Sequence, residues 1–294
     1  MSVADIYEKR STFSFEVFPP KTDVGMEKLC GKDGVLDKLY TLQPDYISCT
    51  YGAGGTNVGK NLEVLDKIQK DGKTIPVTHF TCIGNTKEDI REKLQTYLDH
   101  GIDHMLALRG DLPADGSPAC ADFAHASDLI TYIRETHPNF DIAGACYPEC
   151  HTEASSLEED IANLKKKVDA GATHLISQLF FDNEAFFHFQ AEARKAGITV
   201  PIEAGIMPVT NSKQITRMVS MCGASLPRKF TRIIQKYEDN PTALQDAGIA
   251  YAIAQIIELL AAGVDGIHLY TMNNPYVARK ISEAISGVLR ATQR

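Results

Sequence analysis

The sequence predicts an α/β protein built as a single (β/α)8 barrel, also called a TIM barrel. Eight short segments with strand character alternate with segments of helical periodicity, which is typical of parallel βα units. Three predicted turns from helix to strand begin with Gly101, Gly171 and Gly263, and glycine favours the left-handed conformation that ends many helices. No linker-like segment divides the 294 residues, so one domain is expected over residues 1–294. A doubly wound open sheet is the alternative.

The predicted strands recur at regular intervals. The first covers residues 12–18, where apolar side chains alternate with Ser14 and Glu16 until two prolines, which cannot donate a ladder hydrogen bond, stop it. The other seven are expected at residues 45–51, 76–82, 105–108, 142–147, 175–181, 200–206 and 266–270.

Helices are expected between these strands. The clearest has four aliphatic residues on one face between residues 157 and 168, with acidic residues near its start and lysines near its end, as the helix dipole favours. Thr86 is expected to cap another helix, with Asp89 three residues later. Further helices are expected at residues 24–43, around 62–68, and at 183–196, 211–221, 241–262 and 275–290.

Bulk composition excludes several classes of function. The net charge is −8 and the longest basic run is the three lysines at 165–167, which argues against a nucleic-acid surface. No apolar run approaches the roughly 20 residues that span a bilayer, and no signal peptide begins the sequence. The seven cysteines form no C-x-x-C pair, so reduced thiols and a cytoplasmic location are expected. Metal-binding, phosphate-loop and dinucleotide motifs are not found in the sequence.

Polar side chains gather where the predicted strands end. In a barrel the carboxyl ends of the strands form the mouth that holds active sites, so these side chains are expected to meet in one pocket. They are Glu16, Thr50, His79, Arg109, Asp111, Tyr147, Gln178 and, further along, Gln214. Solvated loops explain any single position equally well, but eight positions in seven units favour a site.

Glu16 is the candidate acid. It lies near the end of the first strand between apolar neighbours, which disfavour a charged carboxylate. A carboxyl group in such surroundings can donate a proton near neutral pH, as general acid catalysis requires. A solvent-facing glutamate on an edge strand is the simpler interpretation of this strand alone, so the neighbouring strands decide.

The other residue types indicate a ligand with a ring and an anionic group. Arg109 and the backbone at Gly110 suit a phosphate oxygen, and Asp111 and Gln178 suit the hydrogen-bonding edge of a heterocycle. The aromatic side chains available to cover a ring are Phe18 and Tyr147, and a helical face beyond the fifth strand carries His151, Asp160, Asn163 and Lys167. That face suits either the polar tail of a nucleotide cofactor or solvent.

Short motifs along nearly the whole chain resemble the methylenetetrahydrofolate reductase family in its short, bacterial-type form. They occur at residues 14–20 (SFEVFPP), 50–53 (TYGA), 108–111 (LRGD), 147–149 (YPE) with His151, 165–172 (KKKVDAGA), 180–182 (FFD) after Gln178, and 205–209 (GIMPV). Each motif alone is weak, but the ordered set is specific.

This resemblance implies an enzyme that holds FAD in the barrel. It would reduce 5,10-methylenetetrahydrofolate to 5-methyltetrahydrofolate with electrons from NADH or NADPH, and the two substrates would use one pocket in turn. The family also implies a cytoplasmic homo-oligomer with no nucleic-acid or membrane partner.

The resemblance also implies roles for individual residues. Glu16 would be the general acid that opens the five-membered ring of the folate, and the charge of Asp111 would favour the resulting cation. Gln178 and Gln214 would orient the folate. The positions that match FAD contacts are Thr50, His79, Arg109, Gly110, Asp111, Ala126, Tyr147, His151, Asp160, Asn163, Lys166 and Lys167.

Four residues depart from the family pattern, and two other functions compete. His125 replaces a tyrosine, Leu179 and Met218 replace phenylalanines, and Asn274 replaces an arginine near the folate tail. A Schiff-base aldolase would need a lysine inside the barrel, whereas residues 165–167 are predicted on a helix. The second competitor is a flavin-binding subunit that takes electrons from a partner protein.

Overall fold

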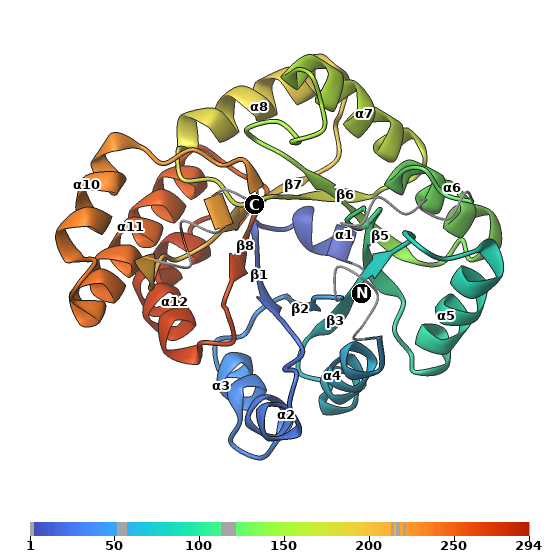
Figure 1. The fold of residues 1–294 in the computed structure, drawn as a ribbon, viewed down its shortest axis with the longest axis horizontal. Helices are drawn as coiled ribbons and strands as arrows, with labels where there is room; N and C mark the ends of the chain where they lie inside the picture. The colour runs from blue at the N-terminus through green and yellow to red at the C-terminus, as the bar shows by residue number, and fades with distance from the viewer. Residues whose placement is uncertain are drawn as a thin grey trace.

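The computed structural model describes residues 3–51, 58–112, 122–212, 215, 218, 219 and 222–293. Eight parallel strands close into a barrel in the order of the sequence, and the last strand pairs with the first (Figure 1). The prediction of a (β/α)8 barrel is therefore confirmed, and the open sheet is excluded.

The strands form the inner wall and the helices surround them (Figure 1). The strands are β1 (Thr12–Val17), β2 (Tyr46–Cys49), β3 (Ile75–Thr81), β4 (His104–Leu108), β5 (Asp141–Cys146), β6 (His174–Ser177), β7 (Ile202–Ile206) and β8 (Gly266–Tyr270). The helices with defined bounds are α1 (Val3–Tyr7), α2 (Asp23–Cys30), α3 (Val35–Tyr40), α4 (Val58–Asp71), α5 (Lys87–Asp99), α6 (Ala126–Thr136), α7 (Leu157–Asp169), α8 (Asn183–Lys195), α10 (Arg228–Tyr237), α11 (Pro241–Ala261) and α12 (Pro275–Arg290).

The alternation of β1 sorts its side chains between two environments. Phe13, Phe15 and Val17 point outward into the large apolar core between the strands and the helices. Ser14 and Glu16 point inward, where they approach side chains from other strands. The inward side of β1 therefore delivers polar groups to the axis of the barrel.

The predicted helix ends are confirmed. Gly101, Gly171 and Gly263 follow helices with φ angles of 73°, 118° and 81°, a region that glycine enters without steric cost. Thr86 and Asp89 form a complete capping box at the start of α5.

The single helix predicted at residues 24–43 is wrong, because the structure has α2 and α3 there. The chain leaves the helical path at Gly31, where ψ is 171°, and a Cβ there would lie 2.4 Å from the carbonyl oxygen of Glu27, so this close backbone contact needs glycine. Asp33 then adopts a φ of 57°, and α3 starts after Gly34.

The predicted sixth strand is too long. β6 ends at Ser177, because the side-chain oxygen of Gln178 accepts the N–H of Leu179 at 2.8 Å in place of a ladder bond. Helices α1, α6 and α10 were not predicted, although Phe230 and Ile234 give α10 a buried i, i+4 pair. The helix predicted at residues 211–221 falls largely outside the described residues.

Helix α1 closes the amino-terminal end of the barrel. The Val3 backbone N–H donates to Asp141 at the start of β5 (3.1 Å), and the Tyr7 hydroxyl donates to Glu203 on β7 (2.9 Å). In the part of the chain that the structure describes, α11 is long and apolar enough to cross a membrane by length and composition. Within the fold, α11 lies in the helical layer and packs against α12.

Candidate active site

Glu16 lies inside the barrel near the carboxyl end of β1. Its side chain is 18% exposed, and Oε2 lies 3.4 Å from Nε2 of His79 and 3.9 Å from Nε2 of His268. The closed barrel has no edge strand, so the solvent-facing interpretation of this glutamate is wrong. The sequence prediction that Glu16 meets His79 at the mouth is confirmed.

His79 supplies a neutral imidazole beside this acid. Burial lowers the pKa of His79 by disfavouring the imidazolium, His268 lowers it further, and Glu16 opposes both effects. Among the described residues, no hydrogen-bond partner reaches its buried Nε2 atom. An unpaired buried nitrogen next to a carboxylate is typical of a binding or catalytic site.

A column of polar side chains continues from Glu16 towards the amino-terminal end. His268 contacts the hydroxyl of Ser14 through Nδ1 (2.7 Å) and that of Ser48 through Nε2 (3.3 Å). Below them the fully buried carboxylate of Glu203 accepts hydrogen bonds from Ser14, Tyr46, Tyr7 and Thr12. His268 and Glu203 are not among the predicted site residues, although each is a polar residue at an inward position of a largely apolar strand.

A second polar group lies at the ends of β4 and β5. Arg109 makes a two-pronged ion pair with Glu153, with N–O distances of 2.7 and 2.6 Å. The pairing raises the pKa of Arg109 and lowers the pKa of Glu153. Gly110 follows with a φ of 92°, a conformation that suits glycine. The Arg109 fork thus already binds an anion with two oxygens, as it would bind a phosphate.

Tyr147, His151, Asp160 and Lys167 come together beside β5, but His151 lies in the loop before α7 and not on the predicted helical face. The rings of Tyr147 and His151 meet edge to face at 4.6 Å, and Asp160 accepts the His151 backbone N–H at 2.9 Å. The Lys167 amine lies 5.8 Å from the Tyr147 ring centre and donates to the Ala145 carbonyl at 2.8 Å. Burial is the main cause that raises the pKa of Asp160 and lowers that of Lys167.

Lys167 lies closer to the barrel than its predicted position on a helix indicated. It belongs to α7, as predicted, but its amine reaches the barrel wall and is buried there. Its stem approaches the outward side of Gly144, 3.9 Å from where a Cβ would lie. Its amine therefore approaches from the outside of the sheet, which still does not match the inward lysine that an aldolase needs.

Several predicted cofactor positions offer less than the sequence suggested. Asn163 and Lys166 are exposed on α7 and bond to each other at 2.8 Å. Ala126 is buried in the first turn of α6, so it can offer only backbone atoms. Thr50 is half-buried after β2, where its carbonyl accepts a hydrogen bond from Asn61 (3.1 Å).

The predicted folate residues are placed in part. Gln178 is half-buried after β6, and its backbone N–H donates to the Cys146 carbonyl at 2.7 Å. Asp111 is exposed after β4, and its negative charge adds to the burial that raises the pKa values of Tyr147 and Cys222. Gln214 lies outside the described residues.

The departures from the family pattern have structural roles here. The His125 backbone N–H donates to the Asp128 side chain at the start of α6 (2.9 Å), and Asn274 caps α12 by accepting the N–H groups of Tyr276 and Val277. Leu179 and Met218 pack in a second apolar cluster that joins the ends of β6, β7 and β8 to α10.

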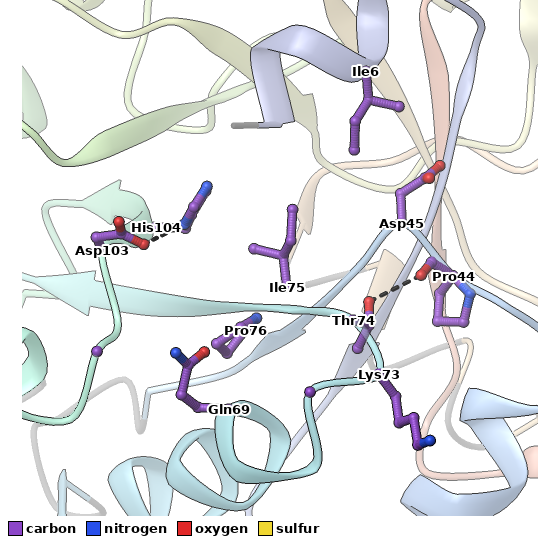
Figure 2. Close-up of a pocket in the computed structure, with 12 residues that line it drawn as sticks. Ile6, Pro44, Asp45, Gln69, Lys73, Thr74, Ile75, Pro76, Asp103 and His104 are labelled. Carbon is purple, nitrogen blue, oxygen red and sulfur yellow. Dashed lines mark hydrogen bonds and ion pairs between the residues drawn. The ribbon is translucent and has the colours of Figure 1, made fainter. Parts of the chain in front are cut away.

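A groove of about 570 Å³ lies at the opposite end of the barrel (Figure 2). Its walls come from the amino-terminal ends of β3 and β4 and from α1, and several of its polar groups are already paired. Asp103 holds His104 at 2.7 Å, and Thr74 donates to the Pro44 carbonyl at 2.9 Å (Figure 2). Because barrel chemistry occurs at the carboxyl ends, we place the site around Glu16.

Sequence comparison finds relatives over almost the whole chain. A family model described as methylenetetrahydrofolate reductase matches residues 2–286. A 5,10-methylenetetrahydrofolate reductase of Pectobacterium carotovorum is 34% identical over 97% of this chain and 93% of its own length. The enzyme of that name from Escherichia coli is 35% identical over 92% of this chain and 90% of its own length.

A plant relative is longer than this chain. Methylenetetrahydrofolate reductase (NADH) 1 of Arabidopsis thaliana is 37% identical over 90% of this chain, but the match spans only 46% of the plant protein. The chain therefore spans about half the length of such relatives.

Solved structures support the same fold at low sequence identity. An uncharacterized protein from Clostridium thermocellum that binds two copies of 5-methyl-5,6,7,8-tetrahydrofolic acid has a TM-score of 0.70 and 16% identity, over 96% of this chain and 97% of that one. A dihydropteroate synthase from Coxiella burnetii in complex with pteroic acid has a TM-score of 0.52 and 11% identity, over 96% of this chain and 93% of that one.

Proposed function

The chain belongs to the methylenetetrahydrofolate reductase family, and on this premise we propose that it reduces 5,10-methylenetetrahydrofolate to 5-methyltetrahydrofolate with NADH or NADPH. FAD is the proposed resident cofactor, and the two substrates use the barrel mouth in turn. The observation that carries the proposal is the Glu16 carboxyl group inside the barrel, 3.4 Å from the imidazole of His79. The folate ligand named for the Clostridium thermocellum protein adds support.

The residues at the mouth fit a flavin nucleotide. The positions matched to FAD come mainly from the ends of β2 to β5 and from α7, which are neighbouring units of the barrel. Arg109 already binds a two-oxygen anion in the form of the Glu153 carboxylate. His79 and Thr81, at the end of β3, add buried polar atoms that lack a hydrogen-bond partner among the described residues. Cations for a diphosphate and unpaired donors for a ring thus line one side of the mouth.

In this proposal Arg109 and Gly110 bind the diphosphate, while Tyr147, His151 and Lys167 hold the rest of the nucleotide. When bound there, FAD would supply hydride transfer between the nicotinamide and the folate. The hydrogen bond to the Ala145 carbonyl holds the Lys167 amine near the Tyr147 ring. Its position is therefore set before the nucleotide binds.

Glu16 acts on the folate. It donates its proton to the nitrogen that leaves when the five-membered ring opens, which converts the bridging carbon into an iminium cation. His79 stays neutral beside Glu16, so it adds no positive charge that would oppose this cation. The exposed carboxylate of Asp111 stabilises the same charge from the rim of the mouth.

Gln178 orients the folate ring. Its Oε1 atom is held by the N–H of Leu179 at 2.8 Å, which fixes the plane of the amide. The Nε2 group then offers donors to the acceptors of the heterocycle.

Anaerobic turnover tests the proposal. Purified protein is reconstituted with FAD and mixed with methylenetetrahydrofolate and either NADH or NADPH, and the folates are separated by chromatography. We expect 5-methyltetrahydrofolate in amounts equal to the nicotinamide oxidised. Product that forms with a chemical reductant but with neither nicotinamide would support a protein electron donor instead.

A further inference from the structure

The turn after β8 lies against the end of β1, next to the acid. Met272 and Asn273 adopt φ angles of 51° and 54° in this turn. Two successive non-glycine residues in the left-handed region are uncommon, and such conformations persist where surrounding contacts hold them. We refer to Thr271–Met272–Asn273 as the β8 turn.

The β8 turn binds the backbone that directly follows the Glu16 side chain. The N–H and hydroxyl groups of Thr271 both donate to the Glu16 carbonyl, at 3.3 and 2.6 Å. The Asn273 side-chain amide makes the two hydrogen bonds that a neighbouring strand would make to Phe18. Its Oδ1 accepts the Phe18 N–H at 3.0 Å, and its Nδ2 donates to the Phe18 carbonyl at 2.8 Å.

These contacts extend β1 beyond its regular pairing. The last residue pair between β1 and β8 is Glu16 with Tyr270. Beyond that pair, the Asn273 side-chain amide takes the place of a neighbouring strand and bonds the backbone of Phe18. The next two residues are prolines, which have no N–H group to donate. The end of β1 that carries the acid is therefore held from the β8 side by two side chains, Thr271 and Asn273.

The hydrogen bonds from Thr271 and Asn273 to the end of β1, called the clamp below, also affect Phe18. Its side chain is 38% exposed next to the carboxyl end of β1. Because both backbone groups of Phe18 are bonded to Asn273, the backbone that carries the Phe18 ring is held in place close to Glu16. The clamp thus fixes the acid and an aromatic surface together.

We propose that Asn273 and Thr271 are positioning residues for Glu16, and that they act on folate reduction while leaving flavin reduction by nicotinamide intact. The proposal rests on the function assigned above. Proton donation depends on the placement of Glu16 to within fractions of an ångström, whereas hydride transfer from nicotinamide to flavin does not use the acid. Loss of the clamp should therefore slow the folate half-reaction and leave the rate of the nicotinamide half-reaction unchanged.

The first test replaces Asn273 by glycine. Asn273→Gly keeps the left-handed backbone accessible and removes both bonds to Phe18. Gln43→Gly is the matched control, because Gln43 has the same φ of 54° in the turn before β2, at the other end of the barrel. We expect reoxidation of reduced flavin by methylenetetrahydrofolate to slow by about tenfold or more in Asn273→Gly, with reduction by nicotinamide within about twofold of wild type in both variants.

The second test uses the Thr271 hydroxyl. Thr271→Val removes the 2.6 Å bond to the Glu16 carbonyl and keeps the shape, while Thr271→Ser keeps the hydroxyl. We expect Val to slow the folate half-reaction selectively and Ser to restore it. Equal losses in both half-reactions, or no loss in Asn273→Gly and Thr271→Val, would overturn the positioning role.

Hydrogen exchange separates the clamp from the assigned function. The Phe18 amide should exchange faster in Asn273→Gly than in wild type and stay unchanged in Gln43→Gly, and unchanged exchange in Asn273→Gly would overturn the clamp itself. A wild-type protein that lacks both half-reactions while Phe18 exchange still responds would instead count against the assigned function.

Discussion

The two ends of the barrel treat their polar groups differently. At the amino-terminal end, Asp141 accepts the Val3 N–H and the Thr173 hydroxyl, and Glu203 accepts four hydroxyl groups. At the carboxyl-terminal end, His79 and Thr81 on β3 carry buried polar atoms that have no partner among the described residues. His104 Nε2 is an exception at the amino-terminal end, although it lies 3.7 Å from Asp141. Satisfied groups stabilise the fold, and unsatisfied ones mark the binding end.

Removing the acid at the carboxyl-terminal end should have the largest effect on activity. Glu16→Gln should slow reoxidation of reduced flavin by methylenetetrahydrofolate by about 10² to 10⁴-fold, since general acid catalysis contributes that much. Flavin reduction by nicotinamide should stay within about twofold. Stopped-flow absorbance measures both steps, and equal loss in both would show that Glu16 only supports the structure.

Removing a carboxylate at the amino-terminal end should instead change stability. Asp141→Ala leaves the buried Val3 N–H without its acceptor, while the Thr173 hydroxyl keeps the Ile142 carbonyl at 3.1 Å, so we expect about 1–3 kcal/mol less free energy of unfolding. Turnover per folded molecule should not change. Urea denaturation provides the measurement, and Asp239→Ala, at an exposed site, is the control. A large loss of turnover in folded Asp141→Ala would break the division between the two ends.

Acidification should destabilise both ends through buried histidines. Burial lowers the pKa of His79 at the mouth and of His174 near the amino-terminal end. Each therefore binds a proton more readily when unfolded, so stability falls as pH drops below about 6.5, at a slope of up to about 1.4 kcal/mol per pH unit for each group.

Single substitutions separate the two histidines. His79→Gln and His174→Gln should each flatten the pH dependence of the unfolding free energy, but His79→Gln alone should also weaken flavin binding. A stability profile that keeps its full slope in both variants would contradict the buried neutral state of these rings.

Two neighbouring lysines give the smallest expected effect. Lys167 has a buried amine near Tyr147, whereas Lys166 is exposed and bonds to Asn163. Lys167→Met should weaken FAD binding by about tenfold, or about 1.4 kcal/mol, and Lys166→Met by less than about twofold. Fluorescence titration of the apoprotein with FAD measures both, and equal losses would indicate that the exposed α7 face also binds the cofactor.

Local features of the fold could be predicted from the sequence. The alternation of β1 correctly separated outward Phe15 from inward Glu16, and Gly101 and Gly263 marked helix ends because glycine tolerates their positive φ angles. Features that depend on competition between local interactions were missed. The break at Gly31 involves a close backbone contact, and the early end of β6 at Gln178 involves a side-chain hydrogen bond, neither of which periodicity records.

The sequence correctly placed Glu16, His79 and Arg109 at or near the carboxyl ends of β1, β3 and β4. The partners of these residues were missed because they come from distant parts of the chain. Glu153 reaches Arg109 from the loop after β5, and Thr271 reaches Glu16 only because β8 closes against β1. Such contacts depend on strand register and closure of the barrel, which sequence spacing does not determine.

The visible absorption spectrum of the protein under anaerobic conditions tests the central claim most directly. Protein reconstituted with FAD is titrated with NADH and then with methylenetetrahydrofolate in one cuvette. We predict flavin bands that bleach with NADH and return with the folate, as the proposed alternating use of the mouth around Glu16 requires. A protein that takes up no FAD, or a reduced flavin that the folate leaves reduced, would contradict the account.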